Sequence, residues 1–240
     1  MARTALVTGG TRGLGRAIAV ALRDGGCRVA ATYRGDEDAA RAMAHETGIA
    51  VFRWDVADFD ACRAGAAAVA EALGPVDILV NNAGITADAM FHRMSEAQWW
   101  DVLRTNLGSM FNMTRQVIDG MRARRFGRVV NIGSINGRKG QIGQSNYAAA
   151  KAGILGFTKA LALENAAHGI TVNAVAPGYC DTAMVAAVRP DVLQAIVAAI
   201  PVGRLGMPAD VARTVAFLAA DDAGFITGAT FDVNGGQYLA

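Results

Sequence analysis

The feature that most constrains this chain lies at its start, where a short apolar run leads directly into a glycine-rich turn. Residues 5–8 read as a strand, and a helical pattern begins at residue 15. Glycine supplies the positive φ angles of such a turn, and amide groups at the helix start favour an anion. A tight turn without a ligand is the alternative. The order of strand, turn and helix favours a pyrophosphate site made of Gly9, Thr11, Arg12, Gly13, Leu14 and Gly15.

Similar apolar runs recur along the chain and alternate with alanine-rich helical stretches. The runs are continuous, as is typical of strands buried on both faces of a sheet. Strands are predicted at residues 5–8, 28–33, 51–56, 76–81, 128–132, 171–176 and 230–233, and helices at 15–23, 58–73, 99–124, 146–165 and 209–219. Strand alternating with helix predicts an α/β fold, a Rossmann-type doubly wound parallel sheet covered by helices.

The chain carries no proline-rich linker, charge block or repeat that would divide it, so we expect residues 1–240 to form a single domain. Residues 179–206 depart from the regular alternation. They contain a helical pattern of their own, at residues 190–200, between the sixth strand and the last helix. This segment predicts a lid over a binding site.

The composition of the chain argues against several kinds of binding partner. Lys plus Arg number 23 and Asp plus Glu 21, and the net charge of +2 argues against nucleic acid or a membrane surface. Cys27, Cys62 and Cys180 lie far apart without C-x-x-C spacing, so we expect reduced thiols and no metal. The apolar runs are shorter than the ~18 residues of a membrane span, and the first residues lack a leader pattern. We expect a cytoplasmic enzyme.

The type of dinucleotide is set near the end of the second strand, where an acidic side chain would bind a ribose 2′-hydroxyl. This chain has Arg34 there, and Arg12 lies inside the glycine-rich turn. Two guanidinium groups suit a 2′-phosphate. We therefore expect NADPH/NADP+ as the cofactor. The alternative is that Arg34 is solvated and Asp36 reaches the ribose.

Tyr147 and Lys151 lie four residues apart in a helical pattern, which places them on one face with Cβ atoms about 5–6 Å apart. A cation at that distance stabilises a phenolate by roughly 3 kcal/mol, or about two pKa units. We therefore expect Lys151 to lower the pKa of Tyr147 toward the range in which an acid–base group works. Taken alone, such a pair is more often a surface pair.

Position along the chain favours the catalytic interpretation. Residues 128–132 form a predicted strand that is followed by Ser134, and ligands of a parallel sheet bind at the carboxyl ends of its strands. Ser134 would then face the same crevice as Tyr147. Asn106 places a polar side chain inside a long helical pattern, where it competes for backbone groups. A satisfied core amide is the alternative for Asn106.

These motifs in combination resemble the short-chain dehydrogenase/reductase family over essentially the whole chain. The resemblance rests on residues 8–15, Asp55-Val56, residues 81–84, Asn106, Ser134, Tyr147-x-x-x-Lys151 and Pro177-Gly178. It implies that Tyr147 protonates a carbonyl oxygen while the nicotinamide delivers hydride. It further implies that Lys151 binds the nicotinamide ribose, that Ser134 polarises the carbonyl and that Asn106 holds a water.

The same resemblance implies further cofactor contacts. They are Asp55, Val56, Asn82, Ala83, Gly84, Tyr147, Lys151, Pro177 and Gly178, with Asp55 at the adenine. A homotetramer is also implied, and Met90, Phe91, Met94, Trp99 and Trp100 belong either to an intersubunit surface or to the core.

Within the family, residues 110–118, 131–137 and 139–147 are similar to acetoacetyl-CoA reductases of polyhydroxyalkanoate synthesis, which make (R)-3-hydroxybutyryl-CoA. That similarity implies that Gln141, Gln144 and Tyr179 line an acyl pocket for an acyl-CoA thioester. Glutamines in solvent are the alternative. Ile142 departs from the aromatic residue found beside Gln141 in those enzymes.

Two other functions remain open. A 3-oxoacyl-(acyl-carrier-protein) reductase shares several motifs, and its acidic carrier needs a basic docking patch. Arg125, Arg128 and His168 are the candidates for such a patch, although His168 is only weakly basic. The more remote alternative is an NADP-binding regulator without turnover, against which the full set of catalytic residues argues.

Overall fold

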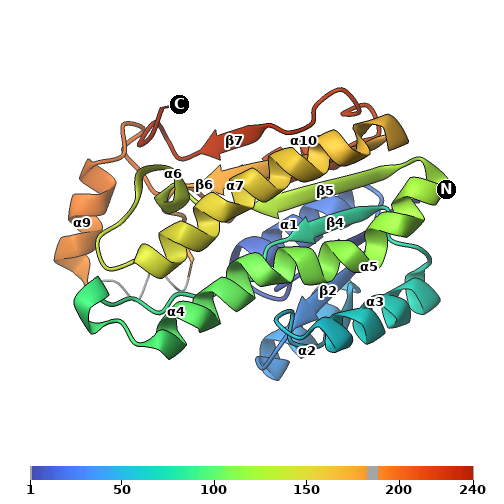
Figure 1. Cartoon of the computed structure of the whole chain (residues 1–240), viewed down its shortest axis with the longest axis horizontal. Coiled ribbons are helices and arrows are strands. Elements are labelled where there is room, and N and C mark those ends of the chain that lie inside the picture. Colours follow the sequence, from blue (N-terminus) through green and yellow to red (C-terminus); the bar gives the residue numbers. More distant parts are fainter. Residues whose placement is uncertain (1, 183–188, 240) are drawn as a thin grey trace.

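The computed structural model describes residues 2–182 and 189–239. Seven parallel strands form one sheet in the order β3-β2-β1-β4-β5-β6-β7 (Figure 1). The strands are β1 (Thr4–Val7), β2 (Arg28–Tyr33), β3 (Ala50–Arg53), β4 (Ile78–Asn81), β5 (Gly127–Ile132), β6 (Ile170–Pro177) and β7 (Thr230–Val233). The order reverses at β1, with β2 on one side and β4 on the other. The predicted α/β fold with a Rossmann-type doubly wound parallel sheet is confirmed.

Helices cover both faces of the sheet. One face carries α1 (Gly13–Asp24), α2 (Glu37–Thr47) and α10 (Pro208–Ala219), and the other carries α3 (Phe59–Leu73), α5 (Ser109–Arg124) and α7 (Ser145–Asn165). Against α7 pack α4 (Glu96–Leu103) and the single turn α6 (Asn136–Lys139). Within the described residues, none of the helices has the length and hydropathy to cross a membrane.

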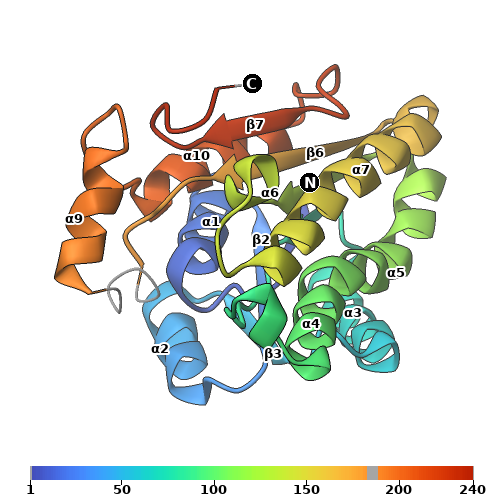
Figure 2. The same cartoon turned by 60° about the vertical axis from the view of Figure 1, so that its left-hand side comes forward.

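The carboxyl ends of the strands are flanked by α4, α6 and α9 (Pro190–Ala198), as the turned view in Figure 2 shows. The predicted lid, residues 179–206, includes α9, but residues 183–188 lie outside the described residues. In the described part of that segment, Cys180 forms a parallel bridge with Gly206.

Side chains of each central strand divide between two apolar layers, which explains why the strand sequences are continuously apolar. In β1, Ala5 and Val7 pack in the layer under α1 and α10, whereas Leu6 packs in the layer under α3 and α5. In β5, Val130 and Val129 divide in the same way. All five side chains are at most 1% exposed. Burial on both faces therefore favours apolar residues at successive positions of a strand.

The structure departs from the predicted elements in three main places. The helix predicted at 99–124 is interrupted by the π-helical turn η2 (Arg104–Gly108), and the part before the interruption, α4, begins at Glu96. The strand predicted at 51–56 ends at Arg53, so Asp55 lies in the loop that follows. Helix α2 was not predicted at all. It begins where Asp36 Oδ1 accepts a hydrogen bond from the Ala39 amide at 3.1 Å, a side-chain cap that favours a helix start.

At the amino end of β5, Arg128 is a buried structural residue. Its guanidinium donates to the carbonyl oxygens of Ala220 at 3.1 Å and Asp221 at 2.9 Å, which ties the end of α10 to the sheet. The Phe126 ring lies 4.4 Å from this guanidinium and 3.4 Å from that of Arg3. Burial lowers the pKa of Arg128 from its usual value. Arg128 is therefore not free to contact a partner.

Candidate active site

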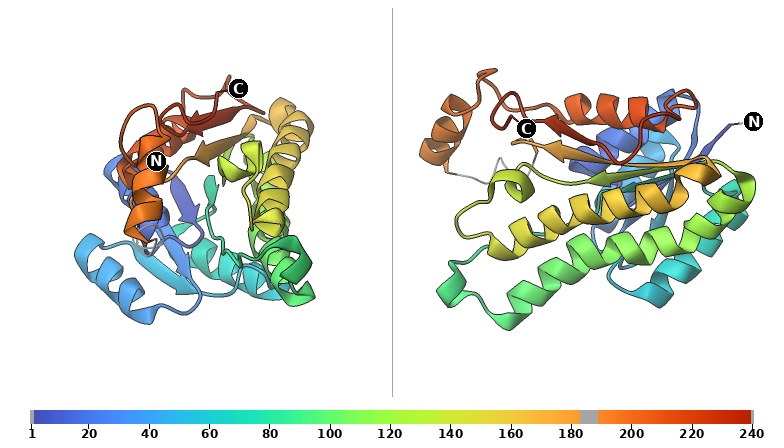
Figure 3. Two further views of the ribbon diagram at one scale, coloured as in Figure 1. Left: turned by 90° about the vertical axis from the view of Figure 1, so that its left-hand side faces the viewer. Right: turned by 45° about the horizontal axis from the view of Figure 1, so that its top comes forward.

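The predicted site residues gather at the carboxyl ends of the strands, the end that faces the viewer in the left panel of Figure 3. The glycine-rich turn follows β1, residues 82–84 follow β4, Ser134 follows β5, and Pro177 ends β6. Tyr147 and Lys151 come from the first turns of α7. Ligands of doubly wound sheets bind at this edge, next to the strand at which the order reverses.

The glycine-rich turn is held by neighbouring polar groups. Gly9 and Gly13 have φ angles of 59° and 53°, and a Cβ atom at Gly15 would clash with the Gly9 carbonyl oxygen. Asn82 Nδ2 donates to the carbonyl oxygens of Thr8 at 2.9 Å and Gly9 at 3.2 Å. These glycines therefore allow α1 to start directly against the turn.

The start of α1 is suited to an anion. Arg12 is its N-cap, and among the described residues no side chain caps the amides of its first turn, which also lacks an acidic residue. In contrast, α2, α3 and α4 are each capped, by Asp36, Asp58 and Ser95. Free amides at the positive end of a helix favour negative charge. The turn therefore fits the diphosphate of a dinucleotide.

Both arginines predicted for the 2′-phosphate lie beside carboxylates. Arg12 Nη1 is 3.5 Å from Asp36 Oδ2, and Arg34 Nη1 is 3.6 Å from Asp55 Oδ2. The two arginine side chains are 76% and 63% exposed, so a ligand can reach them. Asp55 also accepts a hydrogen bond from the Ala57 amide at 2.9 Å, which orients it in the loop after β3.

The other predicted cofactor residues complete the same edge. The Thr8 hydroxyl accepts hydrogen bonds from the amides of Asn82 at 2.9 Å and Ala83 at 3.0 Å, which joins the loops after β1 and β4. Val56 is buried against the core, and its carbonyl accepts from Asn112. At Gly178, a Cβ atom would lie 2.9 Å from Asn234, so only glycine fits there without a shift.

Tyr147 and Ser134 are brought together as predicted. Burial raises the pKa of Tyr147 above its usual value, while a hydrogen bond with Ser134 acts in the opposite direction and the nearby Asp88 carboxylate adds to the increase. Ser134 is itself oriented, because its Oγ accepts a hydrogen bond from the Asn136 amide at 3.1 Å.

The predicted lowering of the Tyr147 pKa by Lys151 is wrong for the protein without its cofactor. Lys151 Nζ lies 5.6 Å from the Tyr147 ring centroid and donates to the Ile132 carbonyl at 2.8 Å. The ammonium thus sits over the ring, with the Ile132 carbonyl as its partner. Lys151 is only 3% exposed, and burial lowers its pKa to about 8. Desolvation, which helix spacing does not reveal, decides both pKa directions.

Asn106 is fully buried in the π-helical turn η2. Its Oδ1 accepts from the Ile85 amide at 2.8 Å and its Nδ2 donates to the Ile85 carbonyl at 2.9 Å. A Cβ atom at Gly84 would lie 3.1 Å from Asn106 Oδ1 and 3.7 Å from Lys151 Nζ. Asn106 therefore lies close to Lys151, and it is at the same time a satisfied amide, so the two interpretations of the sequence do not exclude each other.

Comparison with known proteins places this geometry in a family. The family model for short chain dehydrogenase matches residues 3–193. The chain belongs to the short-chain dehydrogenase family. It is 61% identical to an acetoacetyl-CoA reductase of Shinella zoogloeoides and 62% identical to one of Rhizobium meliloti, each match covering 100% of both chains. It is 45% identical to a 3-oxoacyl-(acyl-carrier-protein) reductase of Vibrio cholerae, covering 99% of this chain and 98% of the other.

As a short-chain dehydrogenase, the protein is an oxidoreductase that acts on a carbonyl or hydroxyl group and uses a nicotinamide cofactor. The residues at the carboxyl edge fit that cofactor, because the free amides at the uncapped start of α1 would hold its diphosphate. Among the described residues, His, Cys, Asp and Glu side chains do not gather in groups of three or more that could hold a metal ion.

The two glutamines that were predicted to line the acyl pocket of this short-chain dehydrogenase lie in different surroundings. Gln144 Oε1 accepts from Asn136 Nδ2 at 2.9 Å, and Gln144 Nε2 donates to Asp88 Oδ2 at 2.8 Å. Gln144 therefore bridges α6 and the loop after β4, and it is not a loop side chain in free solvent. Gln141 is exposed, in agreement with the solvated alternative.

Tyr179 and Asp88 both lie near Tyr147, whose pKa they help to raise. Tyr179 lines a small cavity of about 110 Å³ together with Arg204 and Asn234. Asp88 was missed by the sequence analysis, although its carboxylate influences the pKa of Tyr147 and accepts from Gln144. A single aspartate in residues 84–90 has no motif to mark it, and only the fold brings it to the site.

Proposed function

We propose that this short-chain dehydrogenase reduces acetoacetyl-CoA to (R)-3-hydroxybutyryl-CoA with NADPH. The observation that carries the proposal is the match of the whole chain, at 61% and 62% identity, to two proteins named acetoacetyl-CoA reductase. The site geometry supports it, because Tyr147 and Ser134 meet beside a dinucleotide site. Such a product is a monomer for polyhydroxybutyrate synthesis.

In this proposal the bound cofactor supplies hydride to the 3-oxo carbon. Ser134 and the Tyr147 hydroxyl donate hydrogen bonds to the carbonyl oxygen, and Tyr147 gives it the proton that completes the alcohol. Lys151 binds the nicotinamide ribose, and its positive charge then favours the phenolate left on Tyr147. Asn106 holds a water beside Lys151. Gln141, Gln144 and Tyr179 orient the thioester, and α9 covers it as part of a lid.

The preference for NADPH is proposed from Arg12 and Arg34. Both guanidinium groups are exposed at the adenosine end of the site, and each presents donors in a geometry that matches phosphate oxygens. Their present carboxylate partners lie at 3.5 and 3.6 Å in exposed pairs, which contribute little to stability. A 2′-phosphate can therefore take their place.

The carrier of the thioester is proposed to be coenzyme A, with an acyl carrier protein as the alternative. The alternative rests on the Vibrio cholerae relative at 45% identity. Of the basic residues considered for carrier docking, Arg128 is buried and bound to carbonyl oxygens. Arg125 and His168 lie at the amino-end edge of the sheet, away from the catalytic residues of the same chain. This placement favours a free acyl-CoA.

A comparison of catalytic efficiencies tests the carrier. We expect kcat/KM with NADPH to be higher for acetoacetyl-CoA than for acetoacetyl carrier protein, because the described surface around the site lacks the three-residue basic patch considered above. Steady-state rates with both substrates, at several salt concentrations, provide the measurement. A tenfold advantage of the carrier substrate that disappears at high salt would show electrostatic docking and contradict the assignment.

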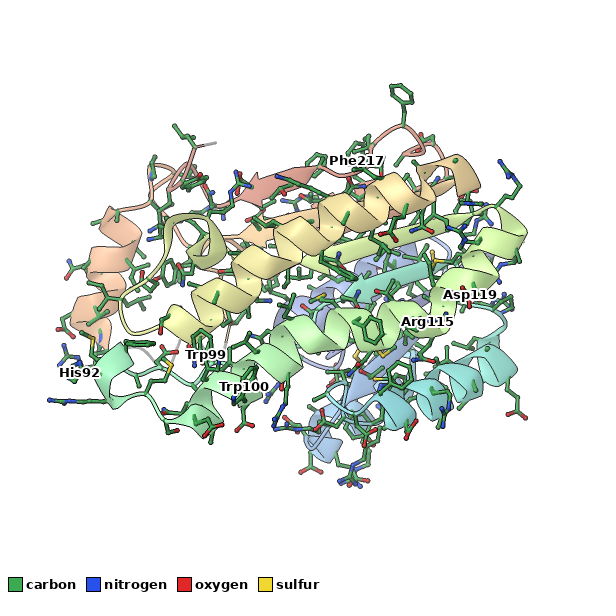
Figure 4. The ribbon with its side chains drawn as sticks, in the orientation of Figure 1. His92, Trp99, Trp100, Arg115, Asp119 and Phe217 are labelled. Atoms are coloured by element: carbon green, nitrogen blue, oxygen red, sulfur yellow. The ribbon has the colours of Figure 1, made fainter. Side chains whose placement is uncertain are left out.

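We also propose that the protein is a cytoplasmic homotetramer. Large apolar side chains are exposed on two separate faces, as Figure 4 shows for Trp100 on α4 and Phe217 on α10. Phe111 on α5 stacks on Phe59 of α3 and is 56% exposed, and Phe225 is 102% exposed between α10 and β7. Exposed apolar patches mark interfaces, and a closed tetramer of two-fold symmetry needs at least two of them. Core packing does not explain Met90, Phe91 or Trp100, which are all exposed.

A further inference from the structure

The adenosine end of the cofactor site contains a carboxylate that the proposed NADPH preference does not use. Asp36 is not at the end of β2, which is Tyr33, but three residues further on, at the start of α2. Its Oδ2 lies 3.5 Å from Arg12 Nη1, and its side chain is 44% exposed. The residue that faces the glycine-rich turn at this point is therefore acidic, beside an arginine suited to phosphate.

We propose that Asp36 is a specificity-determining residue that competes with the cofactor's 2′-phosphate for Arg12. Its carboxylate weakens the preference for NADPH that Arg12 and Arg34 alone would set, and it leaves the site able to take NADH. This inference rests on the proposed use of a nicotinamide dinucleotide. It names the residue that limits how strongly the protein prefers NADPH over NADH.

The two oxygens of Asp36 have different partners, and this fixes the carboxylate in place. Oδ1 accepts from the Ala39 amide at 3.1 Å and caps α2, while Oδ2 faces Arg12. Moving the carboxylate away from an arriving phosphate would break this cap, which is unfavourable, so the cap favours its present position. A 2′-phosphate on Arg12 would thus lie close to a like charge. A ribose 2′-hydroxyl, in contrast, can donate a hydrogen bond to the same oxygen.

The interaction energies indicate that the Asp36 charge has a moderate effect on 2′-phosphate binding. The pair with Arg12 is exposed and worth little by itself, so a phosphate with its higher charge still displaces it. Repulsion between a carboxylate and a phosphate of about two charges, at roughly 6 Å in water-like surroundings, corresponds to about a tenfold change in affinity before salt screening. We therefore expect removal of the Asp36 charge to strengthen 2′-phosphate binding about five- to tenfold.

The test uses the nucleotide halves of the two cofactors. Asp36→Asn removes the charge and keeps an N-cap of equal quality. Isothermal titration of 2′,5′-ADP and of ADP separates the contribution of the 2′-phosphate from the rest of the site. We expect the Kd for 2′,5′-ADP to fall about five- to tenfold and the Kd for ADP to change less than twofold. The ratio of kcat/KM for NADPH over NADH should rise by the same factor.

Asp38→Asn is the matched control. Asp38 lies in the first turn of the same helix, and its carboxylate faces Arg41 on α2 and is 93% exposed. The variant loses the same charge without touching Arg12, so 2′,5′-ADP binding should change less than twofold.

Three outcomes would overturn the proposal: unchanged 2′,5′-ADP binding in Asp36→Asn, weaker binding in that variant, or an equal gain in Asp38→Asn. The first would mean that the carboxylate does not compete, the second that it positions Arg12 for the phosphate, and the third that only net charge matters. The NADPH assignment itself fails separately, if the unaltered protein binds ADP as tightly as 2′,5′-ADP.

Discussion

Tyr147→Phe should reduce the turnover of acetoacetyl-CoA with NADPH by about three orders of magnitude, because general acid catalysis contributes roughly 10²–10⁴-fold to such reactions. The phenyl ring keeps the packing of this half-buried side chain and removes only the hydroxyl that bonds with Ser134. Single-turnover rates of NADPH oxidation give the measurement. Cofactor binding, followed by NADPH fluorescence, should change less than threefold, because the hydroxyl acts on the substrate.

Tyr238→Phe is the control for this variant. Tyr238 lies outside the proposed catalytic set, and its ring is held by the Arg138 guanidinium at 5.1 Å. Its loss of a hydroxyl should leave turnover within a factor of two. Turnover by Tyr147→Phe within tenfold of the unaltered protein would contradict the proposed proton donor. Absence of any turnover in the unaltered protein, with intact NADPH binding, would instead favour the nucleotide-binding regulator.

Lys151→Met should abolish activity and at the same time stabilise the fold at pH 7. Lys151 is buried, and burial lowers its pKa from 10.5 to about 8, which corresponds to a desolvation cost of about 3 kcal/mol. Methionine fills a similar space without a charge. It loses the bond to the Ile132 carbonyl, worth about 1 kcal/mol, so we expect a net gain of about 2 kcal/mol in the free energy of unfolding.

The pH dependence of this gain follows from linkage. The folded protein releases the Lys151 proton near pH 8, whereas the unfolded chain keeps it to about 10.5, so the unfolded chain binds more protons between these values. The unaltered protein should therefore gain stability as the pH rises from 8 to 10.5, and the advantage of Lys151→Met should shrink over that window. Urea unfolding at pH 7 and pH 10 measures both effects.

Lys159→Met provides the comparison, since Lys159 is on the same helix and exposed. It should change the free energy of unfolding by less than about 0.5 kcal/mol, as surface substitutions generally do. If Lys151→Met were less stable than the unaltered protein at pH 7, the ammonium would have to be stabilised by its surroundings, and the account of its lowered pKa would be wrong.

The sheet was predictable because its strands are buried on both faces. Ala5, Leu6 and Val7 must all be apolar, since neighbouring side chains enter opposite layers of the core. Burial on both faces could not predict α2, because this short helix has alanines among charged residues. Its start depends on the single cap from Asp36. Burial on both faces leaves a long pattern in the sequence, whereas a single N-cap residue such as Asp36 is a short signal.

The sequence predicted which residues lie at the candidate site, but it did not predict the directions of their pKa shifts. The position of Ser134 after β5 follows from the rule that parallel strands present ligands at their carboxyl ends. The pKa directions of Tyr147 and Lys151 depend on desolvation, which is a property of the packed site and not of their spacing. Gln144 was expected to face substrate, but Asp88 and Asn136 engage its amide through contacts between distant segments.

We propose that this chain reduces a 3-oxoacyl-CoA with hydride from NADPH and a proton from Tyr147. The most direct measurement is the incubation of the purified protein with acetoacetyl-CoA and NADPH, followed by chiral analysis of the 3-hydroxybutyryl product and by quantification of oxidised cofactor. We expect (R)-3-hydroxybutyryl-CoA in a one-to-one ratio with NADP+. An (S) product, or NADPH left unoxidised while acetoacetyl-CoA is present in excess, would contradict it.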